Sequence, residues 1–467
     1  VLAQASGPLR CLTEVGRMPF GVGKLEALPS PLAVASRTTL RSVRLRRLLA
    51  LVLAAACAYD YLRNVRRVRL IFGRGRSRAR ISPAEASAQA RLASIVARCP
   101  ALSSVYWPTW YAPGALAQFV LLGLKEFRAR VLQRSPYTQE VCRLRDGGQV
   151  ALDWVLPDPA CADQKLPVCV LLHGAFQDST SVTMSDLALD LAERGLPAVV
   201  MNRRGYGGID PGDAELRLSM FGFDEDLDDV LQLVAQRQPG RPIAIVGFSC
   251  GSGFAGRYAG TRGLWSAWSR LGGEQASQDG ADAGGGSAGR ARPRLLCSVA
   301  YDPGYDVSPD GAISRIKPPF SWFVNFGMKY FYAFRHRGEF IKKSESWASL
   351  VGAMLSPTTG VVETFRKCRK LSGVDGSSAW LDMQEVRLRD IALPSLLINS
   401  RDDPICVWQN VEAVLGDIKA NPNLVLADLQ RGAHGCKFTL WGTSNFAHRM
   451  IAEFVTSASE EWRAGSS

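Results

Sequence analysis

The sequence lacks any cysteine pattern that would hold a metal ion or a disulfide framework. Its eleven cysteines, among 467 residues, are scattered along the chain. They form no C-x-x-C pair and no cysteine–histidine cluster at zinc-ligand spacing. We therefore expect reduced thiols, no metal site and no cofactor. Histidine is also scarce, with four residues in all, so any histidine chemistry must come from His173, His336, His434 or His448.

The sequence also lacks long hydrophobic runs, and its excess of positive charge is not distributed along the whole chain. The net charge of +13 arises within residues 1–84, which hold sixteen basic and three acidic residues, whereas the rest of the chain holds 40 of each. A charge-balanced body offers no basic groove for a phosphate backbone, so we expect no nucleic-acid partner. The longest apolar run in the leader, Leu48 to Tyr59, has twelve residues, fewer than the roughly 20 that a membrane-spanning helix needs.

Residues 1–84 are therefore predicted to be a basic leader with two open interpretations. The apolar run and its flanking arginines favour membrane association, by a short span or at the surface, in an intracellular protein. The alternative is a transit peptide to a plastid or mitochondrion, because the segment is rich in Arg, Ser and Ala and poor in acids. Residues 85–140 are expected to form an N-terminal arm.

Short apolar runs alternating with helical periodicity dominate the chain from about residue 141, which is typical of a parallel sheet buried on both faces. The fold class is therefore predicted as α/β, with core segments at 141–302 and 391–460. Residues 270–294 are Gly-, Ala- and Ser-rich and are expected to be a flexible insertion. Residues 303–390, dense in aromatics, are predicted to be a helical cap over the sheet. The predicted strands are 168–172, 197–201, 242–246, 295–300, 394–399 and 424–429.

The run "IVGFSCGSG" ends one of these strands in a serine between two glycines. The pattern G-x-S-x-G at Gly247 to Gly251 resembles the nucleophile elbow of α/β-hydrolases, a sharp strand-to-helix turn that lifts a serine hydroxyl above the sheet. Ser249 is the predicted nucleophile. Cys250 is a possible alternative nucleophile by chemistry, but Ser249 holds the exposed elbow position.

A serine needs a base, an acid to orient that base and donors for the oxyanion. His434, in a glycine-lined loop after the last predicted strand, is the predicted base. The acid should precede it in sequence, and "RDDPI" supplies Asp403, with Asp402 as the alternative; one of the two is expected to cap the following helix. The backbone amides of Ala175 and Cys250 are the predicted oxyanion donors, and His173 is interpreted as a structural turn residue.

Several further motifs make the chain similar to one α/β-hydrolase subfamily, from about Tyr106 to the C-terminal helix. They are "YWPTWYAPGALAQ", "RDGGQVALDW", "LLHG", "MNRRGYGG", "GFSCGSG", "RDDPI" and "GAHGCKF". The subfamily comprises membrane-anchored lipase- and phospholipase-like proteins, plant embryogenesis-associated esterase-like proteins and yeast medium-chain fatty-acid ethyl ester synthase/esterases. The resemblance implies a triad of Ser249, Asp403 and His434.

We therefore expect a serine hydrolase that cleaves carboxylic esters of lipophilic acyl chains through an acyl-enzyme. Two alternatives remain open from the sequence: an acyltransferase making medium-chain acyl esters at the same site, and a non-catalytic scaffold. Haloalkane or epoxide chemistry is disfavoured, because it would need aspartate at the elbow. The expected partners are a lipophilic ester and, through the leader, a membrane; the oligomeric state is left open.

Overall fold

The computed structural model describes most of the chain after its first 30 residues. The described ranges are 31–75, 82–112, 114–132, 135–160, 163, 165–211, 218–261, 293–306, 308, 311–343, 345–371 and 387–465. Almost all of the predicted flexible insertion, residues 270–292, therefore lies outside the described residues. The chain divides into one unit before Cys57 and a much larger unit from Cys57 onward.

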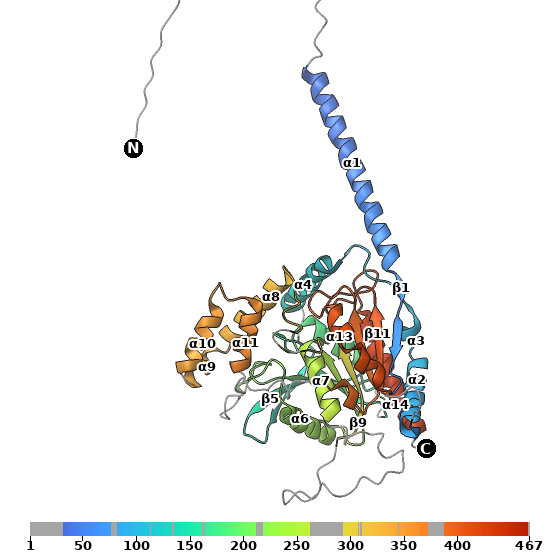
Figure 1. Ribbon diagram of the computed structural model, residues 1–467, viewed down its shortest axis with the longest axis vertical. Helices are drawn as coiled ribbons and strands as arrows, with labels where there is room; N and C mark the ends of the chain where they lie inside the picture. The colour runs from blue at the N-terminus through green and yellow to red at the C-terminus, as the bar shows by residue number, and fades with distance from the viewer. Residues whose placement is uncertain are drawn as a thin grey trace, which may run out of the picture. The chain divides into compact units, whose positions relative to one another are not determined.

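A single nine-stranded sheet forms the centre of the larger unit (Figure 1). The spatial order is β2-β11-β10-β9-β8-β6-β7-β5-β4. Six neighbours from β7 to β11 run parallel, whereas β2, β4 and β5 pair antiparallel at the two edges. The strands are β2 (Arg69–Phe72), β4 (Thr138–Arg143), β5 (Gln149–Val155), β6 (Val168–Leu172), β7 (Ala198–Asn202), β8 (Ile243–Phe248), β9 (Leu295–Tyr301), β10 (Ser395–Ser400) and β11 (Leu424–Leu429).

Helices cover both faces of the sheet, which explains why its central strands are apolar throughout. The helices α5 (Val182–Ala192) and α14 (Phe446–Ala464) pack together on one face, where α14 also contacts α2 (Pro83–Ala97) and α3 (Pro100–Ser103). The helices α6 (Asp224–Arg237), α7 (Cys250–Thr261) and α13 (Trp408–Ala420) cover the other face, α7 and α13 both touching the short turn η4 (Leu388–Asp390). Every residue of β6, β7, β8, β9, β10 and β11 is buried.

The predicted α/β-hydrolase fold is confirmed by this strand order, with a helix-forming elbow after β8 and a mostly parallel sheet. The six predicted strands are confirmed as well, each within two residues of its expected bounds. Sequence patterns had not indicated the edge strands β2, β4 and β5. Strand β2 has only four residues and β4 is largely exposed, while β5 is buried but is interrupted by Asp153, so each carries a weaker apolar signal.

The boundary of the leader at residue 84 falls too late. Strand β2 lies inside the predicted leader and pairs antiparallel with β11, from Arg69 opposite Asp428 to Phe72 opposite Val425. A second pair, β1 (Arg66–Arg67) with β3 (Val105–Tyr106), joins the same segment to the arm. The core therefore includes residues that charge and composition had grouped with the leader.

The long helix α1 (Pro31–Asn64) contains the apolar run of the leader and crosses the boundary between the two units. Its side chains from Leu45 to Leu53 are exposed. Within the part of the chain that the structure describes, no helix combines the length and apolar character needed to cross a bilayer.

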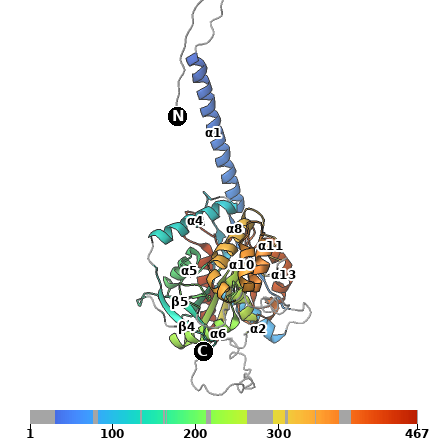
Figure 2. The ribbon, with the colours of Figure 1, turned by 90° about the vertical axis from the view of Figure 1, so that its left-hand side faces the viewer.

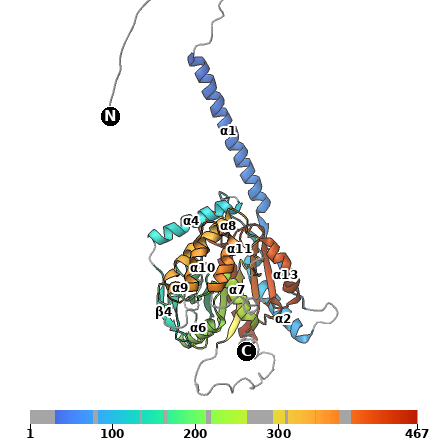
Figure 3. The ribbon, with the colours of Figure 1, turned by 60° about the vertical axis from the view of Figure 1, so that its left-hand side comes forward.

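Between β9 and β10 the chain leaves the sheet and forms helices, as the aromatic segment had indicated (Figure 3). They are α8 (Phe320–Gly327), the π-helical segment η3 (Met328–Phe334), α9 (Arg337–Lys343), α10 (Glu345–Leu355) and α11 (Val361–Leu371). These helices share a separate hydrophobic cluster that includes Met328, Tyr332, Phe340, Met354 and Phe365. They therefore form a cap with its own core.

Candidate active site

The elbow serine lies in a backbone conformation that ordinary residues rarely adopt. Ser249 has φ 53°, between the end of β8 and the start of α7. A Cβ on Gly247 would overlap the carbonyl of Gly251, and one on Gly251 would overlap the carbonyl of Leu172. Glycine at both positions is therefore what allows the turn to be this tight and to present the serine at the carboxyl end of the sheet.

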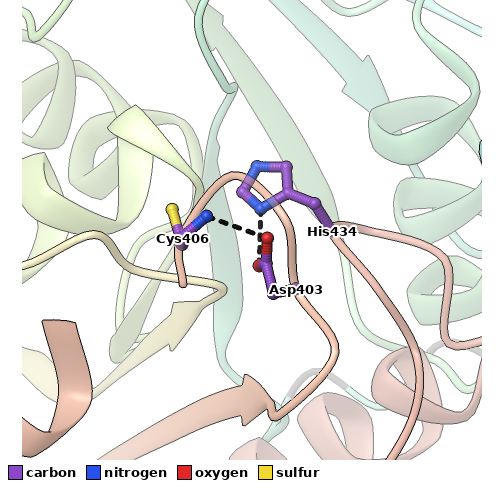
Figure 4. A group of neighbouring side chains, drawn as sticks. All are labelled: Asp403, Cys406 and His434. Atoms are coloured by element: carbon purple, nitrogen blue, oxygen red, sulfur yellow. Dashed lines mark hydrogen bonds and ion pairs between the residues drawn. The ribbon is translucent and has the colours of Figure 1, made fainter. Parts of the chain in front are cut away.

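The predicted base and acid meet at the same end of the sheet. His434 Nδ1 lies 2.8 Å from Asp403 Oδ2, and both side chains are buried (Figure 4). Asp403 follows β10 and His434 follows β11, which are parallel neighbours, so adjacent strands bring the two residues together. The other oxygen of Asp403 accepts hydrogen bonds from the amides of Ile405 and Cys406, both at 2.8 Å.

The electrostatics of this pair favour an ionised acid and a basic imidazole. Burial opposes charge on both groups, but the mutual attraction and the hydrogen bond outweigh it. As a result the pKa of Asp403 is lowered and the pKa of His434 is raised from their ordinary values. His434 is therefore held by Asp403 in an orientation that leaves its second nitrogen, Nε2, free to work as a base.

Asp402, the alternative acid, has a different role. Its Oδ1 accepts the amide of Ala433 at 2.9 Å, and its side chain lies 3.6 Å from Arg431 Nη1. The carboxylate thus fixes the start of the histidine loop. The expectation that one of the two acids caps the next helix is wrong, because the N-cap of α13 is Val407 and receives no side-chain bond.

A buried ion pair, which the sequence analysis had not indicated, fixes the loop that carries His434. Lys437 Nζ lies 2.6 and 2.7 Å from the two oxygens of Asp302, and neither side chain is exposed. Asp302 Oδ2 also accepts the amide of Gly435 at 2.7 Å, and Lys437 donates to the carbonyl of Ala433. Asp302 therefore holds the backbone on both sides of the histidine.

The predicted oxyanion donors also lie at this site. Burial raises the pKa of the Cys250 thiol, against opposing effects of the Arg203 charge and of hydrogen bonds from the amides of Ala175 and Cys250. Both N–H groups therefore approach the Cys250 sulfur, and both residues line the cavity that Ser249 also lines. The raised pKa also keeps the thiol protonated, which argues against Cys250 as the nucleophile.

A buried arginine fixes the turn that carries Ala175. Arg203, from the "MNRRGYGG" motif, donates to the carbonyls of His173 and Gly174, each at 2.7 Å. The ring of His173 contacts Arg203 and the carbonyl of Gly174, and burial lowers its pKa well below the ordinary value. His173 is thus a neutral structural residue, and Arg203 is a positioning residue whose motif had been noticed without its role.

The other two histidines lie away from the elbow. His336 is buried in the cap among Tyr206, Tyr332 and Phe340, and burial lowers its pKa to about 4. His448, on α14, has Nδ1 2.6 Å from Asp190. Of the four histidines in the chain, only His434 shares a cavity with Ser249.

That cavity has a volume of about 260 Å³ and lies between the strand ends and the cap. Ser249, His434, Ala175 and Cys250 all contribute to its wall. The rest is mainly apolar and comes from α4 (Gly114–Leu132), the cap and the loops after β6, β7, β9 and β10. Its apolar residues include Phe119, Leu122, Met220, Phe221, Ile313, Ile316, Phe323, Val324, Met328 and Phe365.

One group of side chains has distances suited to a metal ion among the described residues: Asp403, Cys406 and His434, whose ligand atoms lie within 4.8 Å of one another. However, His434 Nδ1 is already hydrogen-bonded to Asp403, and burial raises the pKa of Cys406 well above its ordinary value. A protonated thiol and an engaged imidazole are poor ligands, so the geometry fits a histidine–carboxylate pair better than a metal site.

The fold and the elbow are those of the α/β-hydrolase superfamily. Comparison with known proteins agrees: residues 163–266 match the family model of serine aminopeptidase, S33 (Hydrolase_4). Phospholipase ABHD3 of Homo sapiens is 21% identical over 388 residues, covering 76% of this chain and 80% of that protein.

Two other relatives match shorter stretches. Protein abhd-3.2 of Caenorhabditis elegans is 28% identical over 156 residues, which cover 32% of this chain and 38% of that protein. Embryogenesis-associated protein EMB8 of Picea glauca is 32% identical over 131 residues, which cover 26% and 28% of the two chains. These matches span well under half of either relative's length.

The similar solved structures are more distant in sequence. The 2,6-dihydroxy-pseudo-oxynicotine hydrolase is 15% identical, with 80% of this chain and 84% of that chain covered and a TM-score of 0.42. The esterase Pf2001 of Pyrococcus furiosus is 17% identical, with 64% and 84% covered and a TM-score of 0.36.

Proposed function

We propose that this protein is a serine hydrolase that cleaves carboxylic esters of lipophilic acyl chains through an acyl-enzyme. The observation that carries the proposal is the 2.8 Å contact between His434 Nδ1 and Asp403 Oδ2, because His434 lines the same cavity as Ser249. A base oriented by a buried acid, beside an elbow serine, is the arrangement that acyl transfer requires.

In this mechanism Ser249 Oγ attacks the ester carbonyl while His434 Nε2 takes the hydroxyl proton. The amides of Ala175 and Cys250 stabilise the oxyanion of the tetrahedral intermediate. The intermediate collapses, the C–O bond to the alcohol breaks, and His434 gives its proton to the departing alkoxide. Water then attacks the acyl-enzyme by the same route, His434 taking its proton and returning it to Ser249 as the acid leaves.

The substrate class follows from the wall of the cavity. Apart from the reacting groups it is lined mainly by apolar side chains of α4 and the cap, which would bury an acyl chain but leave a charged group unsolvated. The name of one relative, a phospholipase, supports an ester of this kind. We assign no head group or chain length.

We also propose that the segment before Cys57 associates with an intracellular membrane. The described part of α1 exposes the apolar side chains from Leu45 to Leu53 beside Arg46 and Arg47. Exposed apolar residues next to arginines suit the interface of an anionic bilayer.

Labelling with a fluorophosphonate probe tests the nucleophile directly. The full chain should label, Ser249→Ala should not, and Cys250→Ala should label because its backbone amide is kept. Turnover of p-nitrophenyl esters of increasing acyl length should then improve as the chain fills the apolar cavity. A folded protein that neither labels nor turns over any ester would overturn the proposal and favour a non-catalytic scaffold.

A further inference from the structure

The rim of the catalytic cavity carries an exposed apolar surface that lies mostly outside the cavity. Helix α4, which contributes Phe119 and Leu122 to the cavity, presents a second apolar stripe to solvent. Its members recur at three- and four-residue intervals, so they lie on one helical face. They are Leu116, Val120, Leu124, Phe127 and Val131, all more than half exposed.

The cap repeats this arrangement beside α4. Segments α8 and η3 bury Met328 and Tyr332 in the cap core yet expose a row of aromatic rings. Phe119 of α4 lies 5.1 Å from Phe320 of α8, measured between ring centroids, and α4 and α8 lie side by side in all three ribbon views (Figure 2). The exposed cap residues are Trp322, Phe323, Phe326, Tyr330, Phe331 and Phe334.

A third group continues the surface past the start of α4. Trp110 packs edge-on against both Tyr111 and Trp441, and the hydroxyl of Tyr111 donates to the carbonyl of Trp441. Leu440 is exposed next to them. We call the exposed side chains of these three groups the aromatic rim.

The aromatic rim is too large and too apolar to be an ordinary solvated face. Phe127, Trp322 and Trp441, one from each group, each expose 68% of their surface. Single exposed apolar residues are common, but a contiguous set around a cavity marks a binding surface. Tryptophan and tyrosine in particular prefer the boundary between the polar and apolar parts of a bilayer.

Basic residues border the aromatic rim, and its cap segment holds few acids. Between Phe320 and Lys343 the chain holds five Lys or Arg and one acidic residue, Glu339. Arg335, Arg337 and Lys342 are exposed after the last ring of the row, and Arg337 stacks on Phe334 at 3.8 Å. At the other end, strand β1, with exposed Arg66 and Arg67, pairs with β3 immediately before Trp107. Positive charge at both ends complements an anionic surface.

We propose that the aromatic rim is a docking surface for an anionic lipid bilayer, distinct from the leader. Its rings would enter the interfacial region of the bilayer while the bordering arginines and lysines meet the head groups. Because the same two helices line the cavity, a docked enzyme would open onto the bilayer and draw acyl esters from it. This last step, and no other part of the inference, rests on the proposed function.

Hydrogen–deuterium exchange of the full chain tests the docking without requiring activity. The chain is compared alone, with phosphatidylcholine vesicles, and with vesicles that also contain phosphatidylserine. Exchange should slow in residues 114–132 and 320–334, most with the anionic vesicles. Slowing confined to residues before Cys57 would overturn the proposal and leave the leader as the sole membrane contact.

A variant with Leu124→Ser, Phe127→Ser, Trp322→Ser and Phe326→Ser removes four rim residues that do not line the cavity. The matched control, Val141→Ser with Leu156→Ser, changes exposed apolar residues of β4 and the segment after β5. The rim variant should lose the vesicle-dependent slowing and about tenfold of its turnover of vesicle-embedded ester, with turnover of a short soluble ester unchanged. The control variant should keep both the vesicle-dependent slowing of exchange and the turnover of vesicle-embedded ester.

The same experiments separate failure of the proposed function from failure of the docking proposal. If no ester is turned over by any form, the proposed function fails while the exchange result still decides the docking. If instead the wild type forms dimers in sedimentation, the rim variant does not, and vesicles slow no rim segment, the surface serves a second copy of this chain and the bilayer proposal is overturned.

Discussion

Asp403 and Asp402 are neighbours in sequence, but only one of them is positioned to orient the histidine. Asp403 contacts His434 Nδ1, whereas Asp402 holds the amide of Ala433. We expect Asp403→Asn to lower kcat by about 10⁴-fold with a small change in KM, since the neutral amide supports the wrong tautomer of the base. Asp402→Asn should lower kcat far less. Equal losses in the two variants, measured by steady-state ester turnover, would contradict the assignment.

The protonation of His434 sets the pH dependence. Burial opposes the charge, but Asp403 raises the pKa of His434 above its ordinary value of 6.5. A protonated imidazole cannot accept the serine proton, so kcat/KM should fall as pH falls through this raised pKa. The acid limb of the pH profile should therefore have its midpoint above 6.5, and Asp403→Asn should move any residual limb to lower pH. A midpoint at or below the ordinary value of 6.5 in the wild type would argue against the pair.

The buried ion pair between Lys437 and Asp302 should contribute strongly to the stability of the fold. Burial raises the pKa of Asp302 to about 6, against the opposing charge of Lys437, so removing the lysine leaves a buried carboxyl without its partner. We expect Lys437→Met to reduce the free energy of unfolding by about 3–5 kcal/mol, measured by urea denaturation. Lys367→Met, which breaks the more exposed pair with Glu363 on α11, should cost under about 1 kcal/mol. Equal costs would contradict the role given to the buried pair.

The residues that the sequence predicted and those that it missed differ in how local their signals are. Ser249 is flanked by the glycines that its own turn requires, and Asp403 and His434 each follow an apolar run that marks a strand end. Asp302, Lys437 and Arg203 have no such local signal. The roles of these three residues depend on contacts between loops that come together only after the sheet has formed. Such contacts between distant segments cannot be deduced from a single sequence.

At the scale of elements, the strands that could be predicted are those buried on both faces. A continuous apolar run such as that of β6 or β11 has one physical explanation in an α/β chain. Strand β2 has four residues, begins with an exposed arginine and lies in a strongly basic stretch. Pairing with β11, rather than its own composition, makes it a strand, so local pattern assigned it to the leader.

The oxyanion turn gives a prediction at this scale. Arg203 joins the start of the loop after β7 to the carbonyls of His173 and Gly174 after β6. Arg203→Met should loosen that turn and lower kcat by about 10²-fold, the order expected for loss of one oxyanion donor, while fluorophosphonate labelling slows in proportion. Arg204→Met is the control, because Arg204 pairs with Asp226 and Asp146 away from the turn. An unchanged kcat in Arg203→Met would refute the positioning role.

At the scale of the whole molecule, the boundary between the two units predicts where the chain tolerates truncation. A protein starting at Cys57 keeps β2, and we expect its melting temperature to match that of the full chain. A protein starting at Arg74 loses β2 and uncovers the edge of β11, so it should melt lower and scatter light through aggregation. Thermal unfolding of the two truncated proteins, followed by light scattering, is the measurement. Indistinguishable behaviour would show that β2 contributes nothing to the core.

The pairing of β2 with β11 has a consequence for the order in which the molecule can be made. A ribosome synthesises β2 before the other strands of the nine-stranded sheet and β11 after them, so this edge of the sheet stays open while the strands between them are made. Strand β2 therefore has no pairing partner while the central strands assemble, because β11 has not yet been synthesised. Completion of the sheet then coincides with synthesis of the histidine loop that follows β11, so a nascent chain acquires the proposed base, His434, only as the sheet is completed.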